Sequence, residues 1–312
     1  MTLKSPLTAA RPLLVLLLTT LVLSACSKEG LYQMAMDREK SQAGLESREM
    51  TINGMDIAYL ESERREGQDS LVLVHGFGAN NLNWLRMARH LKDHYHIIAP
   101  DLPGHGQSTQ DPELNYSIDS QVDNLAALLD QLDVDSAHLA GNSMGGAIVA
   151  MFGAAHPERT RSLALLNPAG IQEHPSELDQ RLEDGENPLV VNDPDDYSQL
   201  LDFVMEERPF IPWPISSVMA EKAAANQDIN RKIFQDIRGG SSEDFREHLT
   251  RIQAPTLILW GARDRVLNAA NAEVFDSLIP DSRVVIFDDI GHVPMIEAPE
   301  RTAKAIHSIT GQ

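Results

Sequence analysis

Short, continuous apolar runs recur along the chain and alternate with longer segments of mixed apolar and polar residues. A continuous run that ends in glycine or a polar loop is typical of a parallel strand that is buried on both faces. The runs of this kind are SLVLVHG, HIIAPDL, SAHLAGNS, RSLALLNPAG, APTLILWGARD and SRVVIFDDIGH. Ahead of them, Asn53-Gly54 lies between alternating apolar residues, which predicts a β-hairpin.

Helices are predicted between these strands. The candidate helices are residues 82–94, 118–132, 144–155, 269–278 and 299–309. Alternating strands and helices require right-handed crossover connections, which produce a parallel sheet with helices on both faces. We therefore expect an α/β fold with a doubly wound, mostly parallel sheet of about eight strands, and a ligand site beyond the carboxyl ends of the strands.

One region interrupts this alternation. Residues 171–251 contain no buried-strand run: they begin with an acidic stretch, and residues 217–249 have a helical pattern. We interpret residues 171–251 as an inserted helical cap. The α/β core would then be formed by residues 49–170 and 252–312.

Residues 1–25 have the layout of a secretory signal peptide. Lys4 and Arg11 precede an apolar stretch over residues 13–23, which is shorter than the roughly 20 residues that a spanning helix needs. Small residues then precede Cys26, the single cysteine of the chain. LSAC resembles the lipobox of bacterial lipoproteins, which implies cleavage before Cys26 and lipidation of its thiol. A plain signal peptide or a short uncleaved anchor is the alternative.

The segment after the cysteine is polar. Residues 26–48 contain scattered leucines and methionines, and either a lipidated, partly helical stalk or a flexible linker fits this pattern. The lipoprotein resemblance, with Ser27 rather than aspartate after the cysteine, implies an envelope protein that faces the periplasm, with the outer membrane favoured.

The charge of the chain limits its partners. The 312 residues carry 26 basic and 46 acidic side chains, a net charge of −20. Phosphate binding needs clustered lysines and arginines, so no nucleic-acid partner is expected. Electrostatic adhesion to anionic lipids is disfavoured for the same reason, so membrane contact must be apolar or covalent. The sequence does not indicate an oligomeric state.

Residues 141–145, Gly-Asn-Ser-Met-Gly, fit the G-x-S-x-G pattern of a nucleophile elbow. An apolar run precedes the pattern and an apolar helical segment follows it, so Ser143 should lie in a strained strand-to-helix turn. Larger residues at the glycine positions would collide with neighbouring backbone, and the helix N-terminus favours developing negative charge. We predict Ser143 as the nucleophile; a glycine-rich structural turn is the alternative.

A serine nucleophile needs a histidine base, and the base needs a carboxylate to orient it. In this architecture the chain order is serine, acid, histidine. After Ser143, His292 is the one histidine that follows a late apolar run within a loop, and Asp264 lies on the loop after the preceding strand. We predict His292 as the base and Asp264 as its orienting carboxylate. Asp288 and Asp289 are the rivals for the acid.

Acyl transfer also needs hydrogen-bond donors for an oxyanion. The N–H of Met144, directly after the nucleophile, is one expected donor. The other is expected in the loop HGFG, where the glycines let the N–H of Phe77 turn toward the site. We interpret His75 and His105 as residues that brace their loops and not as catalytic groups.

Together, HGFG, DLPGHGQS, GNSMGG, GARD and GHVP resemble the α/β-hydrolase superfamily from Met50 to the C-terminus. The resemblance implies the α/β-hydrolase fold, and serine rather than aspartate at the elbow implies esters, amides or related acyl transfer. The cap segments NPLVVNDPDDY and DFVMEERPFIPWPI are similar to a group that includes cold-adapted bacterial triacylglycerol lipases, monoacylglycerol lipases and membrane-bound phospholipases A.

That group shares an apolar cap over an acyl pocket. The resemblance implies that apolar cap residues contact a fatty chain or the bilayer surface; the alternative is that they simply seat the cap on the sheet. The expected substrate-binding residues are Phe203, Met205, Phe210 and Trp213, with Ile211 and Ile215 beside them.

We therefore expect a membrane-anchored serine hydrolase that cleaves carboxylic esters of lipids through an acyl-enzyme. One alternative is the same triad acting on small soluble esters or on a C–C bond. Another is a non-catalytic lipoprotein with a retired hydrolase fold. The sequence contains no H-E-x-x-H, no paired C-x-x-C, no P-loop and no strand-placed G-x-G-x-x-G, so neither a metal nor a cofactor is expected.

Overall fold

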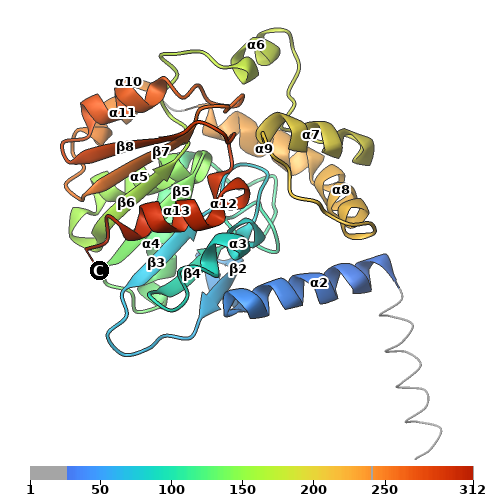
Figure 1. Cartoon of the computed structure of the whole chain (residues 1–312), viewed down its shortest axis with the longest axis horizontal. Helices are drawn as coiled ribbons and strands as arrows, with labels where there is room; N and C mark the ends of the chain where they lie inside the picture. Colours follow the sequence, from blue (N-terminus) through green and yellow to red (C-terminus); the bar gives the residue numbers. More distant parts are fainter. Residues whose placement is uncertain (1–26, 240–241, 312) are drawn as a thin grey trace, which may run out of the picture.

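The computed structural model describes residues 27–239 and 242–311. The predicted signal peptide and the predicted lipidation of Cys26 lie outside these residues. The fold is built on one sheet with helices on both sides (Figure 1). Its strands are β1 Leu45–Ile52, β2 Met55–Ser62, β3 Ser70–Val74, β4 His96–Pro100, β5 Ala137–Asn142, β6 Thr160–Leu166, β7 Thr256–Gly261 and β8 Ser282–Phe287.

The strand order is β1-β2-β4-β3-β5-β6-β7-β8. The pairs β1–β2 and β2–β4 are antiparallel, and every pair from β4 to β8 is parallel. The predicted doubly wound, mostly parallel sheet of about eight strands is therefore confirmed. The hairpin between β1 and β2 turns at Asn53 and Gly54, both with positive φ, as the Asn-Gly pair predicts.

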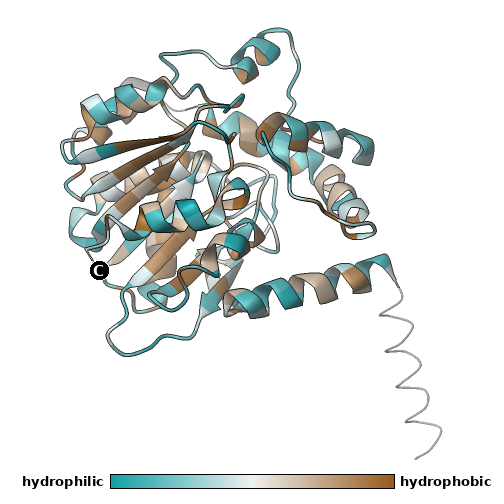
Figure 2. Cartoon of the chain, viewed as in Figure 1, coloured by the Kyte–Doolittle hydropathy of each residue, from teal (hydrophilic) through white to brown (hydrophobic). Residues whose placement is uncertain are grey.

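Alternate residues of each central strand belong to different hydrophobic clusters. In β7, Ile258 and Trp260 pack with the helices on one face, and Leu257 and Leu259 pack on the opposite face. Such burial on both faces explains why the runs are continuous rather than alternating, and the central strands are correspondingly brown in Figure 2.

Two groups of helices cover the sheet. The helices α4, α5, α10 and α11 contribute to the first cluster, and α3, α12 and α13 to the second. Their bounds are α3 Leu85–Ala88, α4 Ile118–Gln131, α5 Met144–Ala155, α10 Ser242–Leu249, α11 Asn271–Leu278, α12 Pro294–Glu297 and α13 Pro299–His307. A 3₁₀ turn over Asn81–Trp84 precedes α3, so the predicted helix over residues 82–94 is much shorter than expected.

The prediction for β8 is wrong in one respect. The sequence predicts a strand buried on both faces, but within β8 only Phe287 is buried. The reason is topological, since β8 is the edge of the sheet and pairs only with β7. Apolar residues on an edge strand are partly exposed even when the run is continuous.

The region between β6 and β7 is helical, and no strand occurs among its described residues. The helices α7, α8 and α9 lie together beyond one end of the sheet (Figure 1). The helix α10, by contrast, packs against α5 and α11, so the predicted cap includes a helix that contacts the core. The helices of this region before α10 are α6 Glu177–Glu183, α7 Tyr197–Val204, α8 Ile215–Ala225 and α9 Gln227–Ile237.

A continuous helix, α2 Lys28–Ala43, fills most of the segment predicted as a stalk or linker. The Ser27 side chain caps its first turn, and Gly44, with φ +68°, ends it. The helix packs against α3, β1 and the cap helix α8. Among the described residues, no helix has the length and apolar character required to cross a membrane.

Candidate active site

Ser143 lies at the turn between β5 and α5. Its φ of +56° is unusual for a residue with a side chain and marks local strain. A Cβ atom at Gly141 would lie 2.1 Å from the Gly145 carbonyl oxygen, and one at Gly145 would lie 2.1 Å from the Val74 carbonyl oxygen. Both glycines of the pattern are therefore sterically required, because backbone atoms occupy the space of a side chain.

Asp264 and His292 are brought together from two neighbouring loops. Asp264 follows β7 and His292 follows β8, and the two strands pair in parallel with aligned carboxyl ends. The Nδ1 of His292 lies 2.8 Å from Oδ2 of Asp264. The carboxylate side chain is fully buried and the imidazole is 7% exposed. The rivals Asp288 and Asp289 do not make this contact: Asp289 pairs with Arg301 instead.

The Asp264 carboxylate accepts several further hydrogen bonds. Oδ2 accepts from the Asn167 side chain at 2.7 Å and from the Trp260 indole at 3.1 Å. Oδ1 accepts from the N–H groups of Val266 and Leu267. Because every other partner is a donor, the His292 contact is best satisfied when Nδ1 carries the proton, which leaves Nε2 free to act as a base.

Asn142 connects this pair to the elbow. Its side-chain amide donates to the carbonyl oxygen of His292 at 2.9 Å and to that of Leu166 at 3.1 Å. The residue directly before Ser143 therefore holds the backbone of the histidine loop. The three predicted catalytic residues lie beyond the same end of the sheet, where β5, β7 and β8 have their carboxyl ends.

The loop after β3 lies against the nucleophile. A Cβ atom at Gly76 would be 3.1 Å from the Cβ of Ser143, so this loop approaches the elbow closely. The ring of Phe77 packs on Phe234 of α9, with ring centroids 5.4 Å apart. Met144 is buried and begins α5, where helix geometry leaves its N–H without an intrahelical acceptor.

Two buried histidines support this loop. His75 donates from Nδ1 to the Gly76 carbonyl oxygen at 2.8 Å, and its Nε2 accepts from the N–H of Leu102 at 3.0 Å. Burial lowers the pKa of His75 to about 3 and that of His105 to about 4, so both rings are neutral near pH 7. The rings of His75 and His105 pack edge to face, with their centroids 5.0 Å apart. These contacts suit the bracing role predicted for both residues.

The apolar residues predicted to bind substrate separate into two pairs. Phe203 and Met205 are buried and pack in different hydrophobic clusters. Phe210 is 87% exposed and Trp213 is 75% exposed. Phe203 and Met205 therefore lie in the interior of the fold, and Phe210 and Trp213 lie on the surface of the cap.

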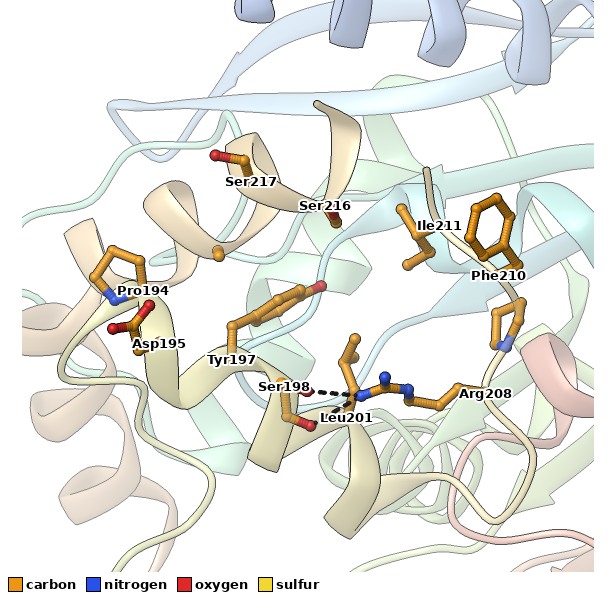
Figure 3. A pocket seen from close by; sticks show the side chains of 12 residues that line it. Pro194, Asp195, Tyr197, Ser198, Leu201, Arg208, Phe210, Ile211, Ser216 and Ser217 are labelled. Carbon is orange, nitrogen blue, oxygen red and sulfur yellow. Dashed lines mark hydrogen bonds between the residues drawn. The ribbon is translucent and has the colours of Figure 1, made fainter. Parts of the chain in front are cut away.

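The cap contains a cavity of about 700 Å³ between α7, α8 and the segment that joins them. Burial raises the pKa of Tyr197 to about 12, and Figure 3 shows its ring extending into the cavity. Arg208 lies along one side, where it donates to the Ser198 hydroxyl at 2.9 Å. Phe210 lines this cavity, whereas Ser143 and His292 do not.

Sequence reasoning missed several residues that hold the site. Asn167 donates to Asp264 and directly follows a buried strand, which is a signal that the sequence offers. Asn142 occupies a variable position of its motif, so its role is visible only in three dimensions. Glu297, on α12 beyond the histidine loop, accepts hydrogen bonds from that loop. Within the described part of the chain, no cluster of three or more His, Cys, Asp or Glu residues is arranged to hold a metal ion.

A sequence profile of the α/β hydrolase fold matches residues 69–299, which includes the elbow and the loops of Asp264 and His292. The chain belongs to the α/β-hydrolase family. This α/β hydrolase is 34% identical to Lipase 3 of Moraxella sp. (strain TA144), over 87% of its own length and 86% of the relative. It is 28% identical to human monoacylglycerol lipase ABHD6, over 81% of each chain.

A solved structure supports the same family. A crystal structure of a membrane phospholipase A, described as a bacterial virulence factor, is 40% identical to this α/β hydrolase. It superposes with a TM-score of 0.88 over 96% of this chain and 97% of the other. The likeness therefore extends through the cap as well as the core.

Proposed function

We propose that this α/β hydrolase is a membrane-anchored serine hydrolase that cleaves carboxylic esters of lipids. The observation that carries the proposal is the buried Asp264–His292 pair, held through Asn142 to the backbone beside Ser143. The relatives named lipase, monoacylglycerol lipase and membrane phospholipase A support a lipid ester as the substrate.

In the proposed reaction, the Ser143 hydroxyl attacks the ester carbonyl carbon while Nε2 of His292 takes its proton. Asp264 holds the imidazole in the required tautomer and stabilises the imidazolium that forms. The tetrahedral intermediate then collapses, and the alcohol leaves with the proton from His292. Water attacks the acyl-enzyme by the same route and releases the fatty acid.

The N–H groups of Met144 and Phe77 are the proposed donors to the oxyanion. The field of α5 adds to the stabilisation, because Met144 is its first residue. Loss of one such donor typically costs about 10²- to 10³-fold in kcat. Bracing of Gly76 by His75 supports this assignment, since it fixes the backbone next to Phe77.

We propose that the enzyme lies in the bacterial envelope, facing the periplasm, and that a lipid on Cys26 anchors it. Residues 171–251 would form the cap over the acyl site, and residues 1–25 would be removed as a signal peptide. The exposed Phe210 and Trp213 suit contact with the bilayer surface, whereas Phe203 and Met205 would border the acyl chain from within the fold. The acidic charge of −20 favours such apolar and covalent contact over electrostatic adhesion.

The test is hydrolysis by wild-type enzyme and the Ser143→Ala variant of a matched substrate panel. The panel contains p-nitrophenyl esters of increasing chain length, monoacylglycerol, triacylglycerol, lysophospholipid and phospholipid. We expect the wild type to prefer long-chain lipids and Ser143→Ala to lose turnover with an unchanged melting temperature. The preferred head group then identifies the physiological class of substrate.

Turnover confined to the shortest esters, or to a vinylogous C–C substrate, would retain the triad and reject lipids as substrates. Activity that survives in Ser143→Ala would reject the nucleophile itself. Labelling with a fluorophosphonate probe is the control for the alternative of a non-catalytic protein with a hydrolase fold. In such a protein, Ser143 would not react with the probe.

A further inference from the structure

The histidine loop and the cap meet at one short segment. The N–H of His292 donates to the carbonyl oxygen of Val204, the last residue of α7, at 2.9 Å. A Cβ atom at Gly291 would lie 3.0 Å from the Val204 carbonyl oxygen and from the N–H nitrogen of Glu206. The backbone before His292 therefore lies directly against the end of α7.

One carboxylate binds both segments. On the histidine-loop side, Glu297 accepts from the N–H of Gly291 at 3.0 and 3.1 Å and from that of Val293 at 3.4 Å. On the cap side, its Oε2 accepts from the N–H of Glu206 at 2.8 Å and from that of Glu207 at 3.1 Å. We call these contacts the Glu297 bridge. The bridge joins residues that are about ninety positions apart along the chain.

The donors of the bridge all point at the same group. A carboxylate has two oxygens and accepts several hydrogen bonds, and charge-assisted bonds of this kind are stronger than neutral ones. Without Glu297, the partly buried N–H of Gly291 would lose its acceptor, which is costly, whereas water can accept from the exposed N–H groups of Glu206 and Glu207. Loss of the carboxylate also removes the hydrogen bonds that connect the two segments, so both should loosen together.

The loop of the acid contacts the same part of the cap. Arg265, next to Asp264, donates to the carbonyl oxygens of Asp202 and Met205 at 3.2 Å each. It also pairs with the carboxylate of Glu206. The end of α7 is thus held by the loops that carry both predicted partners of Ser143.

We propose that Glu297 is a positioning residue that couples the placement of His292 to the seating of the cap at Val204–Glu207. The proposal rests on the function assigned above to His292. In the structure, the bridge and the Val204 contact hold the backbone of the loop that places the imidazole against Asp264. If the end of α7 moves away from the core, the hydrogen bonds that fix the histidine loop break. His292 is then no longer held in position when this part of the cap has moved.

The test compares Glu297→Gln with Glu300→Gln in the full-length enzyme. Glutamine turns one acceptor oxygen into an NH₂ donor that faces the N–H groups of the bridge. Glu300 is a matched control, because it is exposed and its ion pair is an i,i+4 pair with Lys304 on the surface of α13. The first readout is amide hydrogen exchange at residues 204–207 and 290–293. The second is kcat and KM on a soluble short-chain ester.

We expect Glu297→Gln to raise exchange in both segments and to lower kcat by roughly 10- to 100-fold, while KM stays within about twofold. Glu300→Gln should resemble the wild type in both readouts. Glu297→Asp keeps the carboxylate on a shorter arm and should restore part of the exchange protection and part of kcat. A change of global stability alone would raise exchange throughout the chain and would not separate kcat from KM.

Faster exchange in the histidine loop with an unchanged cap segment would overturn the coupling. An unchanged kcat in a folded Glu297→Gln enzyme would overturn the positioning role. If Glu297→Gln does not fold, the same readouts are taken on Glu297→Asp, where wild-type exchange and kcat would overturn the proposal. Failure of the proposed function is distinguishable, because it appears as full activity in Ser143→Ala while the exchange comparison is unaffected.

Discussion

At the scale of the residue, burial shifts the pKa values of three groups beside the loop after β3. His75 and His105 are neutral because the interior disfavours their cations, and burial raises the pKa of Asp101 to about 6. Asp101 still accepts from the N–H groups of Asn81 and Gln107. The contacts of these three groups are thus mainly with backbone N–H and carbonyl groups of the surrounding loops.

These groups make the unfolding free energy depend on pH. The contribution of the two histidines changes with pH in the opposite direction to that of Asp101. The lowered pKa of each histidine contributes stability that is present above pH 6.5 and is lost as the pH falls toward 3 or 4. The raised pKa of Asp101 contributes stability that is present below pH 3.8 and is lost as the pH rises through about 6. The contributions of the two histidines to the unfolding free energy exceed that of the one aspartate. Together, the three groups therefore make the protein less stable as the pH falls from 6.5 to 4.

We predict that His105→Gln flattens the fall in stability on acidification. Each histidine contributes about 1.4 kcal/mol per pH unit to the slope of the unfolding free energy in this window. Removing His105 should reduce the slope by that amount between pH 4.5 and 6. Urea unfolding of wild type and variant at several pH values measures it. Parallel curves for the two proteins would contradict a neutral, buried His105.

At the scale of the element, the elbow was readable from the sequence because its cause is local. The strand β5, the turn and α5 are contiguous, and α5 begins and ends at the residues that the pattern predicts. The order of Ser143, Asp264 and His292 along the strands was predictable for the same reason. Each residue follows its own apolar run.

Other features depend on neighbours that are distant in the sequence. The exposure of β8 follows from its place at the sheet edge, which no residue within it specifies. The hydrogen bond from Asn142 to His292 spans 150 positions, and the Glu297 bridge joins α12 to the cap. Phe203 and Phe210 look alike in sequence, yet one is buried and the other exposed. Phe203 lies on α7 and packs in the first hydrophobic cluster, whereas Phe210 lies in the segment that joins α7 to α8.

We predict that Gly145→Ala destabilises the fold far more than Gly239→Ala. A methyl group at Gly145 would overlap the backbone of Val74, which cannot yield without shifting β3. We expect a loss of at least about 2 kcal/mol in unfolding free energy, together with loss of activity. Gly239 is exposed beyond α9, and its substitution should change stability by less than about 0.5 kcal/mol. Thermal unfolding of both variants tests this, and equal melting temperatures would refute it.

At the scale of the whole molecule, the helix α2 forms ion pairs with the cap helix α8. Lys28 pairs with Glu221 of α8 at 2.7 Å, and Lys222 of the same helix pairs with Glu29 at 2.9 Å. Both pairs are exposed, so each adds little to stability and serves mainly to orient α2 along α8. The first turn of α2 is therefore held against α8, the cap helix that begins at Ile215.

We predict that the double variant Phe210→Ala/Trp213→Ala has reduced activity on bilayer lipids and unchanged activity on soluble esters. Aromatic side chains bind at the membrane interface, and these two are exposed on the segment that leads into α8, the cap helix against which α2 packs. We expect kcat/KM on phospholipid vesicles to fall roughly tenfold, equivalent to about 1.4 kcal/mol of lost contact. Ile286→Ala is the matched control, because Ile286 is 40% exposed on β8 at the edge of the sheet. Equal losses on vesicles and on a soluble ester would mean that the two aromatic residues shape the acyl site and do not contact the bilayer.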